Sequence, residues 1–244
     1  MKKALSICAL VIALFNAQAW ATWSLSQTTV FNSTACGTSA STCTIPVTST
    51  GSGHVIFIGL MSVVASQTIS SVSGGGTYTH PSSCAASESS TARSSDCAYT
   101  LSSTSGTTSI VVTRSSTTIG TWKVCAAEVQ SSVGVGSVDP AFPNGATASS
   151  TTATTSAVGP ALNPTGNNPL NFQILAGGTP TAINQSYVGT FATSAGCATL
   201  INSAPTGGPT WTQGSQDYSA SGISVDESSS VAAVPKLTLL GVGP

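Results

Sequence analysis

The sequence is built from short runs in which apolar and polar residues alternate, and no stretch keeps a helical period. Alternation places successive side chains on opposite faces of a β-strand. Glycine, proline, asparagine and serine, as in Ser105-Gly106 and Asn144-Gly145, mark turns between the runs. Candidate strands cover residues 23–31, 43–48, 54–64, 70–78 with a glycine turn at 74–76, 97–102, 108–114, 119–130, 170–176, 186–193 and 210–213. Such a series predicts an all-β, two-sheet antiparallel sandwich of the jelly-roll or immunoglobulin-like kind.

Two runs carry more specific expectations. Residues 54–64 are almost continuously apolar, which is typical of a strand buried on both faces or central in its sheet. Residues 147–156 are almost purely alanine, serine and threonine, and they fit either an exposed linker or a strand of small residues. The strand is favoured, because alternation and turns resume directly afterwards.

The N-terminus has the pattern of a secretory signal peptide, with two lysines, an apolar run from residue 4 to 15 and a small-x-small site. We expect residues 1–21 to be removed by cleavage after Ala19 or Ala21. The apolar run is well short of the roughly 20 residues that cross a bilayer, and no later stretch is apolar enough. Residues 22–230 are then one β-sandwich domain, followed by a C-terminal tail, 231–244, of unknown role. The expected location is secreted, extracellular or at the cell surface, with the periplasm as a further possibility.

Six cysteines remain after the signal peptide, an even set that favours disulfide bonds in an oxidising compartment. Zinc is the competing interpretation, but no C-x-x-C occurs and neither His54 nor His80 has a ligand-like spacing to a cysteine. The sequence alone allows many pairings. Proximity favours two local bridges, which leaves one long bridge for the remaining two cysteines. The proposed pairs are Cys36–Cys43, Cys84–Cys97 and Cys125–Cys197.

Charge is almost absent from the chain, with 6 Lys and Arg against 7 Asp and Glu and a net charge of −1. A nucleic-acid-binding protein needs a basic surface, so nucleic acid is not expected as a partner. About a third of the residues are serine or threonine, and valine, isoleucine and threonine recur throughout. This composition suits β-structure and differs from that of a disordered chain, which is usually highly charged.

Several segments resemble a loosely defined group of secreted bacterial β-sandwich surface domains. They are STGSGHVIFI at 49–58, VSGGGTYTH at 72–80, YTLSSTSGTTSIVVT at 99–113 and AEV at 127–129. The resemblance covers most of the chain from Trp23 to Gln213, and it implies an extracellular or cell-surface sandwich without an established activity. The extra cysteines and the tail 231–244 depart from the pattern of that group.

No catalytic constellation stands out. A serine hydrolase needs a nucleophile, a histidine base and an acid, but no G-x-S-x-G motif occurs. His54 opens the most apolar run and is expected to make an ordinary hydrogen bond at a strand end. His80 precedes a proline in a loop and is expected to face solvent. We therefore expect no catalytic residues, no cofactor and no metal site.

Glu128 is the carboxylate of most interest, because alternation puts it on the same face as Trp122, Val124 and Ala126. A carboxylate on an apolar face is either paired or part of a site. A structural partner, Arg114 or backbone amides, is the favoured interpretation. The other acidic candidates are Glu88, Asp96, Asp139, Asp217, Asp226 and Glu227.

These observations favour a non-enzymatic extracellular structural or interaction module of adhesion type. The first alternative is a carbohydrate-binding sandwich, in which exposed tryptophans such as Trp122 and Trp211 stack on sugar rings. The second is a secreted hydrolase with an unrecognised site, which requires two carboxylates in a common cleft. Surface polysaccharide and other cell-surface proteins are the partners that fit, and the oligomeric state stays open.

Overall fold

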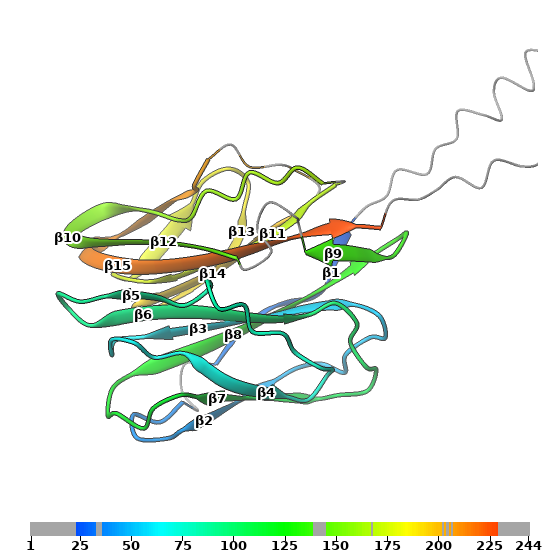
Figure 1. Ribbon diagram of the computed structural model, residues 1–244, viewed down its shortest axis with the longest axis horizontal. Helices are drawn as coiled ribbons and strands as arrows, with labels where there is room; N and C mark the ends of the chain where they lie inside the picture. Colours follow the sequence, from blue (N-terminus) through cyan, green and yellow to red (C-terminus); the bar gives the residue numbers. More distant parts are fainter. Residues whose placement is uncertain are drawn as a thin grey trace, which may run out of the picture.

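The computed structural model describes residues 23–32, 36–138, 145–166, 168–201, 203, 205 and 207–228. Within these residues the chain is all-β and antiparallel, and its three sheets stack as layers (Figure 1). The expected signal peptide, the tail 231–244 and Asp139 lie outside the described residues.

The central layer has five strands, in the order β1-β8-β3-β6-β5. Their bounds are β1 Trp23–Asn32, β8 Trp122–Ser131, β3 Val55–Ser62, β6 Arg93–Thr100 and β5 Ala86–Glu88. Every residue of β3 and β6 is buried, as expected of strands that are covered on both faces. The apolar run at 54–64 therefore supplies the middle of the molecule.

The other two layers cover the two faces of the central sheet. The small sheet has the order β2-β7-β4, with bounds β2 Thr42–Pro46, β7 Ser109–Arg114 and β4 Ile69–Ser73. The large sheet has the order β10-β15-β11-β14-β13, and β9 and β12 also pair with β15. Its bounds are β9 Val135–Val138, β10 Ala146–Val158, β11 Leu170–Ala176, β12 Pro180–Ile183, β13 Val188–Ala192, β14 Ala195–Leu200 and β15 Thr210–Glu227.

Strand β3 contributes to the core on both of its faces. Phe57 points to the large sheet, where its ring stacks on Phe172 with centroids 4.9 Å apart. Ile56 and Ile58 point the other way and pack with Ile110 of the small sheet. A second strand, β8, divides its side chains in the same manner. Two apolar cores therefore lie on either side of the central sheet, and each one stabilises the fold through burial of apolar surface.

All three expected disulfides are present. The Cα atoms are 4.8 Å apart for Cys36–Cys43, 5.5 Å for Cys84–Cys97 and 6.6 Å for Cys125–Cys197, within the usual range. The first two bridges close local loops. The third joins β8 of the central sheet to β14 of the large sheet and so ties two layers together. The disulfides indicate an oxidising, extracellular-type environment.

The predicted all-β, disulfide-linked class is confirmed, but the two expected sheets are three. The difference arises because β3, β6 and β8 carry apolar side chains on both faces, and each face requires its own cover. The serine- and threonine-rich run is a strand, β10, as favoured. The expected second strand after the glycine triplet is missing, since only Thr79 makes an isolated bridge, to Tyr99.

Candidate functional site

Glu128 lies at the mouth of the core between the central and small sheets. On β8 the residues that face this core are Trp122, Val124 and Ala126, and Glu128 is next on the same face. Gln130, one step further, is exposed. The face predicted for Glu128 is therefore correct, and the carboxylate marks the point at which the apolar layer gives way to solvent.

The Glu128 carboxylate accepts hydrogen bonds from three separate segments. Its Oε1 atom accepts one from the backbone N–H of Gly51, at 2.7 Å, and lies 2.8 Å from Nδ1 of His54. Its Oε2 atom accepts one from Nε2 of Gln27, the residue that faces Glu128 from β1. Only 5% of the Glu128 side chain is exposed, so these donors replace the water that burial removes.

The expected backbone amide is therefore present among the partners of Glu128, but the expected arginine is not. Arg114 instead places its guanidinium 5.1 Å from the centre of the Trp122 ring and donates a hydrogen bond to the carbonyl of Thr38. Arg114 ends β7 and has Ile69 of β4 as its partner, which puts it away from the Gly51 end of the molecule. An interaction with the face of a ring is favourable for a guanidinium.

His54 directly precedes β3 and makes the hydrogen bond expected of it. A carboxylate can only accept, so the Nδ1 atom of His54 carries the proton that it donates to Glu128. The hydroxyl of Ser26 contacts the same Nδ1 atom, at 3.1 Å. Within the described residues the Nε2 atom makes no hydrogen bond, and 20% of the His54 side chain is exposed. In a neutral ring that donates from Nδ1, Nε2 is the acceptor nitrogen.

These residues line a groove of about 650 Å³, within the usual range of about 300–1,000 Å³ for ligand pockets. Its walls come from the start of β1, the loop before β3 and the end of β8. We call it the Glu128 groove. Its lining residues are Leu25, Ser26, Gln27, Thr48, Ser49, Gly51, His54, Glu128 and Gln130.

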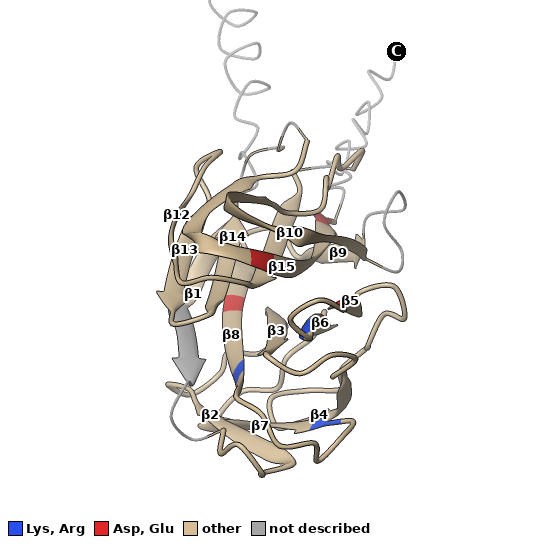
Figure 2. Ribbon diagram, turned by 90° about the vertical axis from the view of Figure 1, so that its left-hand side faces the viewer, with Lys and Arg blue, Asp and Glu red and all other residues tan. Residues whose placement is uncertain are grey.

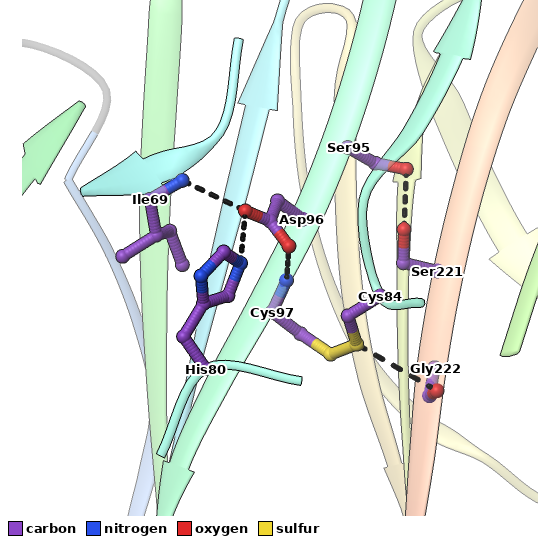
Figure 3. The surroundings of a disulfide bond; sticks show 8 residues. All are labelled: Ile69, His80, Cys84, Ser95, Asp96, Cys97, Ser221 and Gly222. Atoms are coloured by element: carbon purple, nitrogen blue, oxygen red, sulfur yellow. Dashed lines mark hydrogen bonds and ion pairs between the residues drawn. A yellow bond between two sulfur atoms is a disulfide. The ribbon is translucent and has the colours of Figure 1, made fainter. Parts of the chain in front are cut away.

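His80 is exposed, as expected, but it also contacts a buried carboxylate that the sequence did not predict as its partner. Its Nε2 atom lies 2.7 Å from Oδ2 of Asp96, a fully buried residue of β6 (Figure 3). Asp96 also accepts hydrogen bonds from the backbone N–H groups of Ile69 and Cys97. The hydrogen bond to Asp96 is the main cause that raises the pKa of His80; burial opposes it and the charge of Asp96 adds to it. This pair joins a loop to β4 and β6 beside a disulfide.

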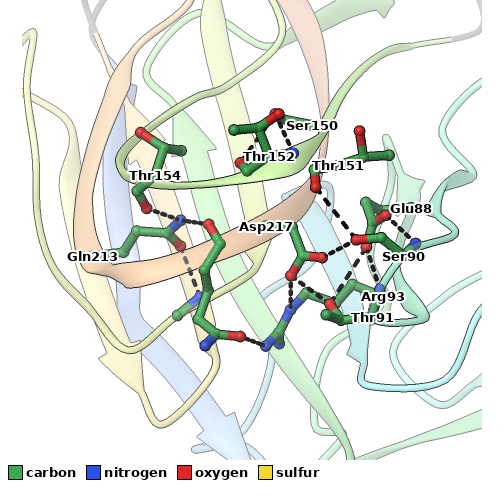
Figure 4. Close-up of polar contacts among 12 residues, drawn as sticks. Glu88, Ser90, Thr91, Arg93, Ser150, Thr151, Thr152, Thr154, Gln213 and Asp217 are labelled. Carbon is green, nitrogen blue, oxygen red and sulfur yellow. Dashed lines mark hydrogen bonds and ion pairs between the residues drawn. The ribbon is translucent and has the colours of Figure 1, made fainter.

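Two carboxylates do come together elsewhere, at Glu88 and Asp217. Thr91 joins them, since its backbone N–H donates to Glu88 at 3.0 Å and its hydroxyl donates to Asp217, and Arg93 lies 3.3 Å from Asp217 (Figure 4). Burial raises the pKa of Asp217, but hydrogen bonds from Ser90, Thr91 and Arg93, and one shared with Glu88, together lower it to about 2. Both carboxylates are almost completely buried, at 2% and 3% exposure. The cluster joins the β5–β6 hairpin to β15.

Trp122 and Trp211 are both fully buried, at 0% exposure, and so cannot stack on a sugar at the surface. Trp23 is buried as well, at 2% exposure. The reason is architectural, since a third layer covers the face of β8 that carries Trp122, and Phe191 packs edge-on against Trp211. The positions of charged residues are few along the ribbon and come from several different strands (Figure 2).

Sequence reasoning singled out Glu128 but missed Gln27 and Gly51 as its partners, and it missed the groove. The segment 49–54 contains two glycines and precedes an apolar strand, which indicates a turn but not what the turn contacts. His54 and Glu128 are 74 residues apart, and only the pairing of β3 with β8 brings them together.

No family model, no curated protein and no solved structure matches this chain. The described residues include no helix long and apolar enough to cross a membrane. They also include no group of three or more histidine, cysteine or acidic residues positioned to hold a metal ion.

Proposed function

We propose that this protein is a non-enzymatic interaction module of the bacterial extracellular space, secreted or held at the cell surface, and that it binds its partner through the Glu128 groove. The observation that carries the proposal is the arrangement of Ser26, His54 and Glu128. In a hydrolytic triad the acid and the nucleophile use opposite nitrogens of the histidine. Here both groups contact the same nitrogen, Nδ1.

This arrangement favours binding over hydrolysis. The Nδ1 atom already carries the proton that it donates to Glu128, so it cannot accept a proton from Ser26. The imidazole therefore cannot act as a base toward Ser26 while Glu128 orients it. The carboxylate instead holds the ring, the loop at Gly51 and the side chain of Gln27 in fixed positions. Rigid polar groups in an open groove are typical of a recognition surface.

The extracellular setting is supported by the three disulfides and by the expected signal peptide. The low charge fits a module that works among other surface components without strong electrostatic attraction to any of them. The resemblance to secreted bacterial surface domains points the same way.

The proposal is tested with labelled, oxidised protein added to intact cells of the producing bacterium. Wild type is expected to bind in a saturable manner. Thr48 is an exposed groove residue whose side chain makes no hydrogen bond within the described part of the chain, so Thr48→Trp fills the groove and should lower binding at least tenfold. Thr155→Trp, at an exposed position on β10, is the matched control and should bind as wild type does.

Binding that is unchanged in Thr48→Trp contradicts the groove as the binding surface. The same preparations are assayed on chromogenic ester, glycoside and peptide substrates. Turnover that is present in wild type and lost in Thr48→Trp contradicts the non-enzymatic proposal.

A further inference from the structure

The hollows of this protein gather at one end of the central sheet. The Glu128 groove is one of them. A second hollow, of about 820 Å³, lies beside Gly74–Gly76 and the end of β6. Ser103 stands between the two, because it donates a hydrogen bond to the carbonyl of Gly51 and accepts one from the backbone N–H of His54. Only 3% of Ser103 is exposed, and its two hydrogen bonds fix its position between the two hollows.

Register across the sheet explains why this end is polar. Gln27, Glu128, Ile56 and Thr100 occupy one row across strands β1, β8, β3 and β6. Three of these four positions carry polar side chains. The apolar layer therefore ends at this row, and both hollows lie at the same end of the central sheet.

The charge of the lining excludes most ligand classes. Among the described residues, no lysine or arginine lines either hollow, and Glu128 is the only acid in the two linings. An anionic ligand would therefore meet a carboxylate and no cation, which is repulsive. A cationic ligand would find three of the roughly four acceptor positions of the Glu128 carboxylate already taken by Gln27, Gly51 and His54. A neutral ligand is left as the best match.

The remaining groups are those that bind hydroxyls. Serine and threonine hydroxyls both donate and accept, and the side-chain amide of Gln130 does both as well. His54 adds an acceptor when its ring is neutral, since its Nδ1 proton is donated to Glu128 and its Nε2 atom makes no hydrogen bond within the described residues. These protein groups can therefore match neighbouring hydroxyl groups on a sugar ring, because each sugar hydroxyl can both donate and accept a hydrogen bond.

We infer that the Glu128 groove binds a neutral saccharide and that Nε2 of His54 accepts a hydrogen bond from one of its hydroxyls. This inference rests on the proposed function, because it names the ligand class for the same groove. It differs from the tryptophan platform considered from the sequence, since recognition here uses polar side chains and no aromatic stacking. Glu128 acts as a positioning residue, which fixes the tautomer and orientation of His54.

The test measures binding of full-length oxidised protein to neutral, uronic-acid-containing and amino-sugar oligosaccharides on an array, followed by titration calorimetry with the neutral oligosaccharide that binds best. His54→Phe removes the acceptor and should weaken that binding at least tenfold. His54→Gln keeps an acceptor oxygen and should retain most of it. Thr48→Trp should abolish binding, and Thr155→Trp should leave it unchanged.

Neutral oligosaccharide binding that follows this order supports the inference. Absence of binding to every neutral oligosaccharide by folded wild type overturns it, as does a preference for uronic-acid-containing or amino-sugar probes. Equal binding by wild type and Thr48→Trp overturns it too. Because cell binding is measured separately, a groove-dependent signal on cells with no saccharide binding leaves the proposed function standing and removes only the ligand class.

Discussion

Gly59 of β3 lies opposite Cys125 of β8, close to the point at which the Cys125–Cys197 disulfide crosses between two sheets. A methyl group on Gly59 would come within 2.8 Å of the Cys125 sulfur and 2.5 Å of a methyl carbon of Ile174. A hydrogen atom is therefore the only substituent that lets the central and large sheets approach each other around this bridge.

Gly59→Ala is expected to lower the free energy of unfolding by about 1–3 kcal/mol, because an extra methyl overpacks a filled core. Gly214→Ala is the control, since the nearest atom to its new methyl would be 3.9 Å away. Urea unfolding of the oxidised proteins measures both. Equal midpoints for Gly59→Ala and wild type would show that the sheets can separate slightly without cost.

The long disulfide should contribute most to stability. Cys125 and Cys197 are 72 residues apart, against 7 for Cys36 and Cys43. In the chain-entropy account the long bridge stabilises by about 4 kcal/mol and the short one by roughly 2 kcal/mol. Replacing both members of each pair by serine and comparing the thermal midpoints checks this. A larger loss for the Cys36–Cys43 pair would contradict the entropic ranking.

Much of the layer arrangement could be read from the alternation in particular strands. The run at 54–64 predicted a strand covered on both faces or central in its sheet, and β3 is both. Two disulfides followed from proximity in the sequence, and the third joined the two remaining cysteines. The number of sheets could not be read in this way. A strand that is apolar on both faces indicates that other segments pack on each face. It does not indicate that residues 42–46, 69–73 and 109–114 form a separate sheet.

The candidate site was predictable only in part, for a similar reason. Alternation placed Glu128 on the right face of β8, yet its partners come from β1 and from the loop before β3. Contacts between segments that are far apart in sequence depend on strand pairing, which local pattern does not determine. The burial of Trp122 followed from the unexpected third layer.

Asp217 should make stability sensitive to acid. Its pKa is about 2, below the ordinary value of 3.8, so its contribution is complete above about pH 4 and is lost as the pH falls through 2. Asp217→Asn should therefore be less stable than wild type at neutral pH, and the difference should close between pH 4 and 2. Ser90→Ala removes one hydrogen-bond donor to the Asp217 carboxylate, so the loss of stability in acid should begin at a higher pH than in wild type. A difference that stays constant down to pH 2 would contradict this.

His80 should have the opposite dependence. Its hydrogen bond to Asp96 raises its pKa above 6.5, against the opposing effect of burial, so its contribution is complete below about pH 6.5 and is lost as the pH rises through the raised value. Thermal midpoints measured from pH 5 to 9 should fall more steeply in wild type than in His80→Ala, in which the ring is absent. The ring protons of His80 should titrate by NMR with a midpoint above 6.5. A midpoint at or below that value, or parallel stability profiles, would mean that Asp96 is held by the Ile69 and Cys97 amides without help from the imidazolium.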